Sequence, residues 1–221
     1  MSATAKLFTS KNPLQDFEPP AAFAPSGFYF GDGSEPGLAA PDRPVTDWDG
    51  VVDRYEPRLN AANGAVLHIG AGSGELMEAL RQHGFLVMGC EPAPLPAQWA
   101  RESHGFDTRT LQCSSAESFL RWTRRIGQKA QAIFFRHDLE HCLELQALLP
   151  ALADALHGKG LLIAQLPPPS VDHPREAHLS FLQELAVACT SCGDRFEIAG
   201  VDCDFESGFM AFVLRKTPSP D

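Results

Sequence analysis

A short apolar run that leads directly into a glycine-rich loop constrains the fold of this chain more than any other feature. The run covers residues 65–69, and the loop covers residues 70–74 (GAGSG). Apolar residues at helical spacing follow the loop, and a second apolar run over residues 85–90 ends on the acid Glu91. The pattern predicts a strand, a tight loop, a helix and a second strand, with the carboxylate of Glu91 at the end of the second strand.

The spacing of the glycines indicates which kind of cofactor this unit can hold. Glycines permit a sharp turn and a close approach to a ligand, and an acid one strand over can accept hydrogen bonds from the hydroxyl groups of a ribose. A dinucleotide-binding loop of the type G-x-G-x-x-G/A needs a small residue at position 75, where this chain has Glu75. Because an anionic side chain beside the loop disfavours a pyrophosphate, the pattern favours a nucleoside cofactor without phosphate over a nicotinamide cofactor.

Several segments, in this order along the chain, resemble the class I S-adenosylmethionine-dependent methyltransferases. The loop with Glu91 is similar to the first motif of that family and to the acidic end of its second strand. Residues 111–117 (LQCSSAE) are similar to the segment after the third strand that contacts adenine, and residues 132–137 (AIFFRH) are similar to the fourth strand and its end. Residues 139–163 contain the sequence LEH, then an expected helix and an expected strand. This order is similar to that of the small-molecule methyltransferases in the family. The resemblance covers about residues 60–215.

The resemblance implies that the chain binds S-adenosylmethionine and transfers its methyl group to an acceptor. His137 and His141 are the candidate catalytic residues, because a histidine that follows the fourth strand can remove a proton from the acceptor near neutral pH. The alternative is that both histidines have ordinary structural roles. We expect no metal. The candidate cofactor-binding residues are Gly70, Ala71, Gly72, Gly74, Glu91, Ser115, Ala116 and Arg136.

Two positions depart from the pattern of the family. The family usually has an acid two residues before the first glycine, where this chain has His68, and an Asp before the alanine that follows the third strand, where it has Ser115. We expect an enzyme that methylates a small-molecule acceptor. The alternative left open by these departures is a catalytically inactive methyltransferase-like domain that serves as a binding or assembly module.

The expected elements have the order of a Rossmann-like, doubly wound α/β sheet. A lead-in helix is expected over about residues 48–61, and the clearest later helix covers about 142–156, with Gly158 as its stop signal. The segment 205–208 is too short for a crossover helix, so the sheet should be mostly parallel with a C-terminal antiparallel hairpin and the strand order 3-2-1-4-5-7-6 of the family. Seven strands are expected, near residues 65–69, 86–90, 108–111, 132–136, 160–166, 195–202 and 208–215.

The chain divides into an N-terminal arm and one domain. Residues 1–47 hold seven of the 18 prolines and predict an irregular, Pro-rich arm, while residues 48–217 form the methyltransferase-like domain. The arm is too aromatic for a free tail, so we expect it to cover apolar surface of its own domain or of a second copy, which makes a homodimer an expected partner. The alternative is that residues 28–31 (FYFG) fold over the ligand as a lid.

Charge and hydropathy exclude several classes of partner. A net charge of −10 argues against a nucleic-acid-binding surface, and no apolar run approaches the roughly 18 residues of a membrane span. Residues 2–20 lack the apolar core of a secretory signal, so we expect a cytoplasmic protein with a small-molecule substrate. The six cysteines suit reduced, buried thiols.

Two short patterns are similar to metal-binding motifs, and we interpret both as accidental. Residues 137–141 (HDLEH) match the H-x-x-E-H pattern of zinc peptidases, but they follow directly on an apolar strand rather than lying in a helix. Cys189 and Cys192 have C-x-x-C spacing, yet no second pair of ligands is evident. His173 and His178 are expected in an exposed segment, with substrate contact as the alternative.

Overall fold

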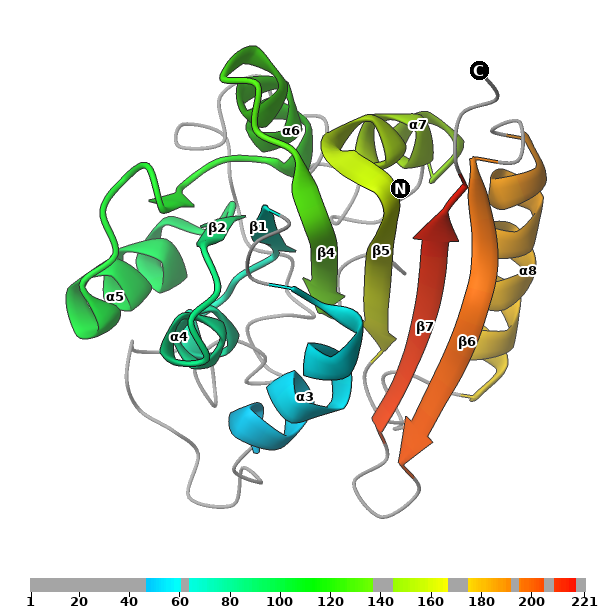
Figure 1. Cartoon of the computed structure of the whole chain (residues 1–221), viewed down its shortest axis with the longest axis horizontal. Coiled ribbons are helices and arrows are strands. Elements are labelled where there is room, and N and C mark those ends of the chain that lie inside the picture. Colours follow the sequence, from blue (N-terminus) through cyan, green and yellow to red (C-terminus); the bar gives the residue numbers. More distant parts are fainter. Residues whose placement is uncertain are drawn as a thin grey trace.

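Seven strands form a single sheet, and helices cover both of its faces (Figure 1). The computed structural model describes residues 47–60, 64–136, 145–166, 175–191, 195–204 and 209–217. The strands are β1 (Ala65–Ile69), β2 (Val87–Cys90), β3 (Leu111–Gln112), β4 (Ala130–Arg136), β5 (Leu156–Leu166), β6 (Phe196–Asp204) and β7 (Phe209–Lys216). The helices are α3 (Trp48–Tyr55), α4 (Glu75–Gln82), α5 (Pro94–His104), α6 (Ala116–Arg125), α7 (Leu145–Ala155) and α8 (Arg175–Ser191), and a 3₁₀ turn covers Glu56–Arg58.

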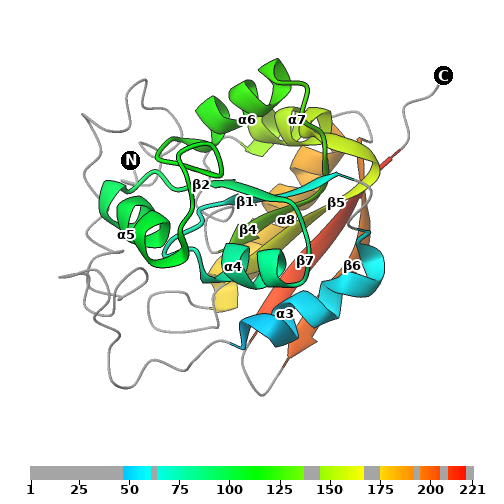
Figure 2. The ribbon, with the colours of Figure 1, turned by 60° about the vertical axis from the view of Figure 1, so that its left-hand side comes forward.

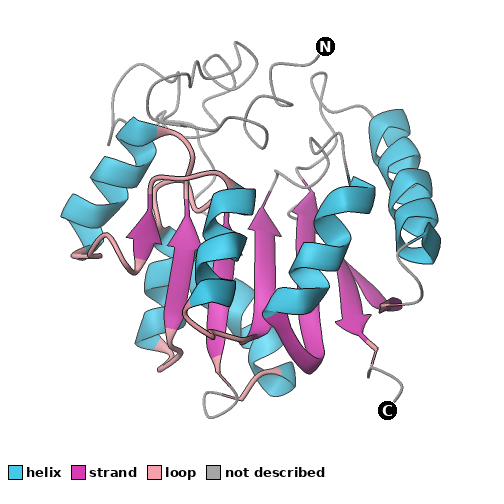
Figure 3. Ribbon diagram, turned by 90° about the horizontal axis from the view of Figure 1, so that it is seen from above, coloured by secondary structure: helices cyan, strands magenta, loops and turns pink. Residues whose placement is uncertain are grey.

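The strands lie in the order β3-β2-β1-β4-β5-β7-β6, which confirms the order expected from the sequence. Strands β1 to β5 pair in parallel, and β7 is antiparallel to both β5 and β6, as expected for a C-terminal hairpin. The strand order reverses between β1 and β4, and ligands of open α/β sheets bind outside the carboxyl ends of the strands at such a reversal. Figure 3 shows the arrowheads of the parallel strands at one edge of the sheet, which is where the candidate site lies.

Strand β1 is buried along its whole length, because helices cover both faces of the sheet. Val66 belongs to the core beneath α3, α4 and α5, whereas Leu67 belongs to the core beneath α6, α7 and α8. Figure 2 shows α3 and α4 on one side of the sheet and α6 and α7 on the other. Alternate residues of a strand point to opposite faces, so His68 lies on the same side as Val66.

Two helices end earlier than the sequence suggests. The lead-in helix α3 ends at Tyr55, not near residue 61, because Pro57 lies in the 3₁₀ turn that follows and has no N–H to continue the helical hydrogen bonds. Helix α7 ends at Ala155, and β5 begins at the next residue. Gly158 is therefore not the stop of this helix but a residue of the strand.

The beginning of β5 is irregular, which explains how a strand replaces the expected loop. Ala130 of β4 pairs with Leu156, whereas Ala132 pairs with Leu161, so the residues between them are accommodated as a bulge. Within this bulge Lys159 has a positive φ of 65°.

The third strand is shorter and later than expected, because an aspartate turn occupies the residues before it. The Asp107 side chain accepts hydrogen bonds from the amides of Arg109 and Thr110, at 3.0 and 2.6 Å. This geometry is typical of an Asx turn and keeps residues 108–110 in a turn, although the carbonyl oxygen of Thr110 already accepts a hydrogen bond from the amide of Gly89 in β2, at 2.7 Å.

The N-terminal arm expected over residues 1–47 lies, apart from its last residue, outside the part of the chain that the structure describes. In the described part, no helix is both long and apolar enough to cross a membrane.

Candidate active site

The glycine-rich loop between β1 and α4 is fixed to the end of the neighbouring strand. The amides of Gly70 and Ala71 both donate hydrogen bonds to the carbonyl oxygen of Cys90, the last residue of β2, at 3.0 Å. The amide of Gly74 donates to the carbonyl oxygen of Ala71, also at 3.0 Å, as α4 begins. These three amides already have acceptors within the protein, so they are not available to bind a phosphate group.

Glu91 connects this loop to the end of β2. The side chain is fully buried, its Oε2 accepts a hydrogen bond from the amide of Gly72, and its Oε1 accepts one from the amide of Ala93, both at 2.8 Å. Burial raises the pKa of the carboxyl group to about 7, although the two backbone hydrogen bonds act in the opposite direction. Each oxygen keeps a second lone pair for a further donor, and a ligand can reach it only after the residues that cover it move.

The segment after β3 contains two serines with different roles. Ser115 is the N-cap of α6: its Oγ accepts the amide of Ser118 at 3.4 Å and donates to the hydroxyl of Ser118 at 3.2 Å. The Oγ of Ser114 is buried and has no hydrogen-bond partner among the residues that the structure describes. Ser114 is therefore the better candidate to bind a ligand, and sequence reasoning missed it. The preference of helix N-caps for serine was the signal that could have separated the two.

Cys113 lies next to these serines, close to Glu91. Its thiol donates a long hydrogen bond to the carbonyl oxygen of Pro92, at 3.8 Å. Burial, and then the charge of Glu91, raise the pKa of the Cys113 thiol, while Arg101 lowers it. The thiol therefore stays protonated and contributes a polar surface rather than a nucleophile.

The ends of β1, β4 and β5 bring together residues that lie far apart in the sequence. His68 is 2% exposed and pairs in register with Phe134 of β4. At the end of the same strands, Arg136 pairs with Gln165, whose side chain is buried. The backbone thus places Arg136 at the carboxyl edge as expected, whereas His137 lies just outside the described residues.

Comparison with known proteins agrees with the fold and with the geometry of the glycine-rich loop. The sequence matches a family model described as a methyltransferase domain over residues 42–190, which is more than half of the chain and includes the loop and Glu91. The chain belongs to the class I S-adenosylmethionine-dependent methyltransferase family. Among curated proteins, none matches the sequence of this methyltransferase.

Solved structures share the fold of this methyltransferase at low sequence identity. SMU.776, a putative methyltransferase complexed with SAH, is 11% identical with a TM-score of 0.53, and the match covers 77% of this chain and 50% of that chain. The plantazolicin methyltransferase BpumL, in complex with a monoazolic desmethylPZN analog and SAH, is 13% identical with a TM-score of 0.61, and the match covers 89% and 95%. The ribosomal protein L11 methylase from Lactobacillus delbrueckii subsp. bulgaricus is 18% identical with a TM-score of 0.57, and the match covers 93% of both chains.

The match to this chain spans only about half the length of the first solved structures that it resembles. It covers 50% of SMU.776 and 45% of a second putative methyltransferase, from Streptococcus mutans. These identities are low enough that the likeness shows a common fold alone.

The end of α5 supports the glycine-rich loop of this methyltransferase through contacts that the sequence did not reveal. The Nε2 of His104 lies 3.1 Å from the carbonyl oxygen of Ser73. The ring of His104 is packed between Trp99 and Phe106, with ring centroids 5.8 and 5.6 Å away. Arg81 of α4 lies over the same Phe106 ring, 5.0 Å from its centroid, so α4, α5 and the loop form one packed unit.

Gly74 is expected to tolerate alanine poorly, because its φ is +85° and an added Cβ would approach Ala100 at 3.0 Å and Phe106 at 3.1 Å. Gly84 is the matched control, since its φ is +84° and an added Cβ would meet nothing within 4 Å. We expect Gly84→Ala to cost about 1–2 kcal/mol for the strained backbone, and Gly74→Ala to cost roughly 1–3 kcal/mol more. Denaturant unfolding of both variants measures the difference. Equal losses would show that the loop can move away from α5.

The structure describes only some of the remaining candidate residues. His141 and the whole of residues 137–141 lie outside the described residues, as does Cys192 of the C-x-x-C pair. Cys189 is partly buried against the core, as expected for a structural thiol. His173 also lies outside the described part, and His178 belongs to α8, whose described residues continue to Ser191.

Proposed function

We propose that this methyltransferase transfers the methyl group of S-adenosylmethionine to a small-molecule acceptor. The observation that carries the proposal is the hydrogen bond from the Gly72 amide to the buried carboxylate of Glu91. It joins the glycine-rich loop that follows β1, the strand beside the reversal of the strand order, to the acid that follows β2, and it leaves lone pairs of the carboxylate for a ribose diol.

The described residues fit a nucleoside without phosphate. The loop amides of Gly70, Ala71, Gly72 and Gly74 already donate to protein acceptors, so a pyrophosphate would find none of these four amides unpaired. The hydroxyl of Ser73 donates to the carboxylate of Glu75 at the start of α4, which places a negative charge beside the loop. This arrangement supports S-adenosylmethionine over a dinucleotide.

Each candidate residue has a distinct part in the proposed reaction. Bound S-adenosylmethionine supplies an electrophilic methyl group, which the acceptor attacks in line with the departing sulfur. Glu91 accepts hydrogen bonds from the ribose, while the hydroxyl of Ser114 and the start of α6 at Ala116 contact the adenine. His137 or His141 removes the proton that the acceptor loses as its new bond to carbon forms.

The proposed nature of the acceptor rests on the charge of the chain and on the resemblance of residues 139–163 to small-molecule methyltransferases. An overall charge of −10 disfavours an RNA acceptor. BpumL, which was crystallised with a plantazolicin analog, and the ribosomal protein L11 methylase, which carries the name of a protein substrate, both match along nearly their whole length. We therefore propose a small molecule and make a protein acceptor an outcome of the same activity screen.

Calorimetry with S-adenosylhomocysteine and NAD tests the cofactor assignment. We expect S-adenosylhomocysteine to bind at least about 100-fold more tightly than NAD, because four of the loop amides already have acceptors in the protein and Glu75 lies beside the loop. The variant Glu75→Gln should reduce this discrimination by strengthening NAD binding alone. Tighter binding of NAD, or no heat from S-adenosylhomocysteine at millimolar concentration, would refute the proposal.

A binding module without catalytic activity is the second candidate function. Its supporting observation is Ser115, which stands where the family usually has Asp. The hydroxyl of Ser115 caps α6 and is therefore engaged within the protein. Normal binding of S-adenosylhomocysteine, combined with no turnover on any acceptor in a broad screen of metabolites and proteins, would favour this candidate.

A further inference from the structure

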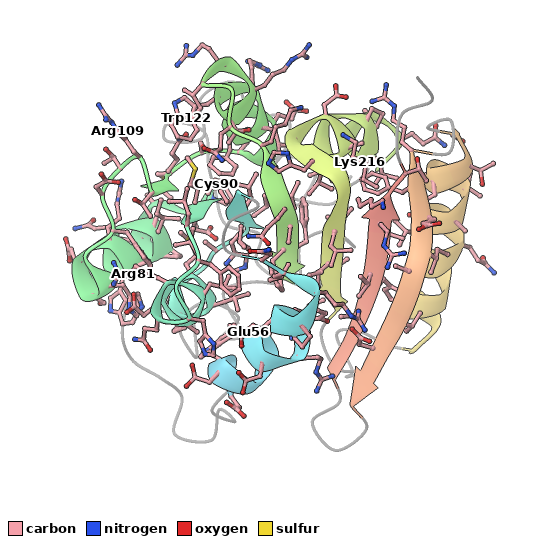
Figure 4. The ribbon with its side chains drawn as sticks, viewed as in Figure 1. Glu56, Arg81, Cys90, Arg109, Trp122 and Lys216 are labelled. Atoms are coloured by element: carbon pink, nitrogen blue, oxygen red, sulfur yellow. The ribbon has the colours of Figure 1, made fainter. Side chains whose placement is uncertain are left out.

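Four side chains of the types that bind metals gather between α3 and α4, at the end of α4 that is farther from the cofactor loop. Asp49, Asp53 and Glu56 follow one another at intervals of four and three residues, so they line one side of α3 and the turn that follows it. His83 caps the end of α4 and faces them. Figure 4 labels Glu56 on the side of α3 that approaches α4.

The distances in this cluster are longer than those of ordinary hydrogen bonds and suit an ion between the groups. The Nδ1 of His83 lies 3.6 Å from an oxygen of Glu56 and 3.9 Å from an oxygen of Asp53, and its Nε2 lies 3.5 Å from an oxygen of Asp49. Hydrogen bonds of this kind measure about 2.7–3.2 Å. Two atoms that each bind one ion at about 2.1 Å are separated by roughly 3.0–4.2 Å. One ligand atom each from Asp53, Glu56 and His83 lies within 4.8 Å of the others.

The donor set indicates the class of ion. An imidazole nitrogen with carboxylate oxygens suits zinc and its neighbours in the first transition series, whereas calcium and magnesium prefer oxygen ligands alone. The three carboxylates also repel one another, and a divalent cation removes this repulsion. The side chains of Asp53 and Glu56 are 64% and 49% exposed, so an ion can enter from solvent, while that of His83 is only 22% exposed and supplies the fixed ligand.

We propose that Asp53, Glu56 and His83 form a surface site for a divalent transition-metal ion such as Zn²⁺, with Asp49 beside it. The ion links α3 to the end of α4 and thereby stabilises the packing of the lead-in helix against the sheet. It takes no part in methyl transfer. The competing arrangement is a protonated His83 that forms ion pairs with the same carboxylates without a metal.

Zinc titration of the chelator-treated, full-length protein tests the site. We expect one equivalent of Zn²⁺ to bind at His83, and Zn²⁺ to raise the unfolding temperature of the wild type. His83→Ala and the pair Asp53→Asn with Glu56→Gln should each weaken Zn²⁺ binding at least tenfold and abolish the rise. His157→Ala is the matched control, because it removes an exposed imidazole from β5 and should change neither result. Mg²⁺ and Ca²⁺ should not compete at tenfold excess.

Two further measurements keep the test decisive. Binding of S-adenosylhomocysteine should stay within twofold in the His83→Ala variant, which shows that the variant is folded and that the metal site is separate from the cofactor site. With Co²⁺ in place of Zn²⁺, the absorption spectrum should lack a thiolate charge-transfer band, because no cysteine belongs to the site. Stoichiometric zinc binding that survives in His83→Ala, a thiolate band, or no zinc binding by the wild type would each overturn the proposal.

Discussion

Replacing Glu91 with alanine is expected to weaken the binding of S-adenosylhomocysteine by roughly 10- to 150-fold, or about 1.5–3 kcal/mol. The variant loses the charge-assisted hydrogen bonds to the ribose. It also removes the acceptor of the Gly72 and Ala93 amides, which the carboxylate binds at 2.8 Å in the structure. Isothermal titration calorimetry measures the loss directly. An unchanged affinity would place the ribose elsewhere in the protein.

Two controls separate the ligand contact from the loss of structure. Glu102→Ala removes an exposed acid of α5 and should leave the affinity within twofold. Glu91→Gln keeps the size of the side chain but replaces one oxygen with an NH₂ group that cannot accept a backbone amide. It should therefore lower both the cofactor affinity and the unfolding temperature. If only the unfolding temperature falls, Glu91 holds the loop without touching the ligand.

The same carboxyl group predicts how binding depends on pH. Its pKa is raised from an ordinary 4.5 to about 7, so the folded protein holds this proton more tightly than the unfolded chain. The stabilising contribution of the group is complete below pH 4.5 and is lost as the pH rises through about 7. The ionised form accepts hydrogen bonds better, so the affinity for S-adenosylhomocysteine should rise over the same interval and binding near pH 7 should release a proton.

Calorimetry in buffers with different ionisation enthalpies detects this proton. The release should disappear in Glu91→Gln, whereas proton release that survives in the variant would assign the titration to another group.

The second large effect is expected at His137 and His141. If one of them is the base, its alanine variant should lose about 10² to 10⁴ in kcat, while the affinity for S-adenosylhomocysteine stays within twofold. Proton removal stabilises the transition state and contributes nothing to cofactor binding, which is why the two measurements should separate. Turnover is measured as the release of S-adenosylhomocysteine with an acceptor identified in the metabolite screen.

His157→Ala, which removes an exposed histidine of β5, should keep full activity in the same assay. Zinc should restore neither variant. Zinc bound at one equivalent and lost from both His137→Ala and His141→Ala together would instead support the H-x-x-E-H interpretation. Full turnover in both variants would show that neither histidine is the base and that the reaction proceeds by alignment or through another group.

The unit around the glycine-rich loop could be predicted from the sequence because the forces that form it are local. Apolar periodicity defines β1, α4 and β2, and Gly74 adopts a φ of +85°, which other residues rarely do. The strand order followed from the resemblance to the family, and the structure confirms it. Element ends were less predictable, since Pro57 and the Asp107 side chain act within single turns that periodicity does not detect.

The identity of the polar groups in the site was harder to predict, since it depends on which hydrogen bonds the fold has already used. Ser114 and Ser115 are chemically the same, but only Ser115 begins a helix and caps it, so the buried hydroxyl of Ser114 remains for a ligand. Glu91 was identified from its place after a strand, yet its burial and its raised pKa come from the helices and loops packed around it.

The sequence by itself determined which segments become strands and helices and which acid follows β2, because those properties depend on neighbours along the chain. Only the tertiary structure decided that His104 braces the loop and that His83 meets Asp53 and Glu56. Such contacts join separate elements, so they depend on how the helices lie on the sheet. That arrangement is set by the packing of the whole core, and no short segment of the sequence encodes it.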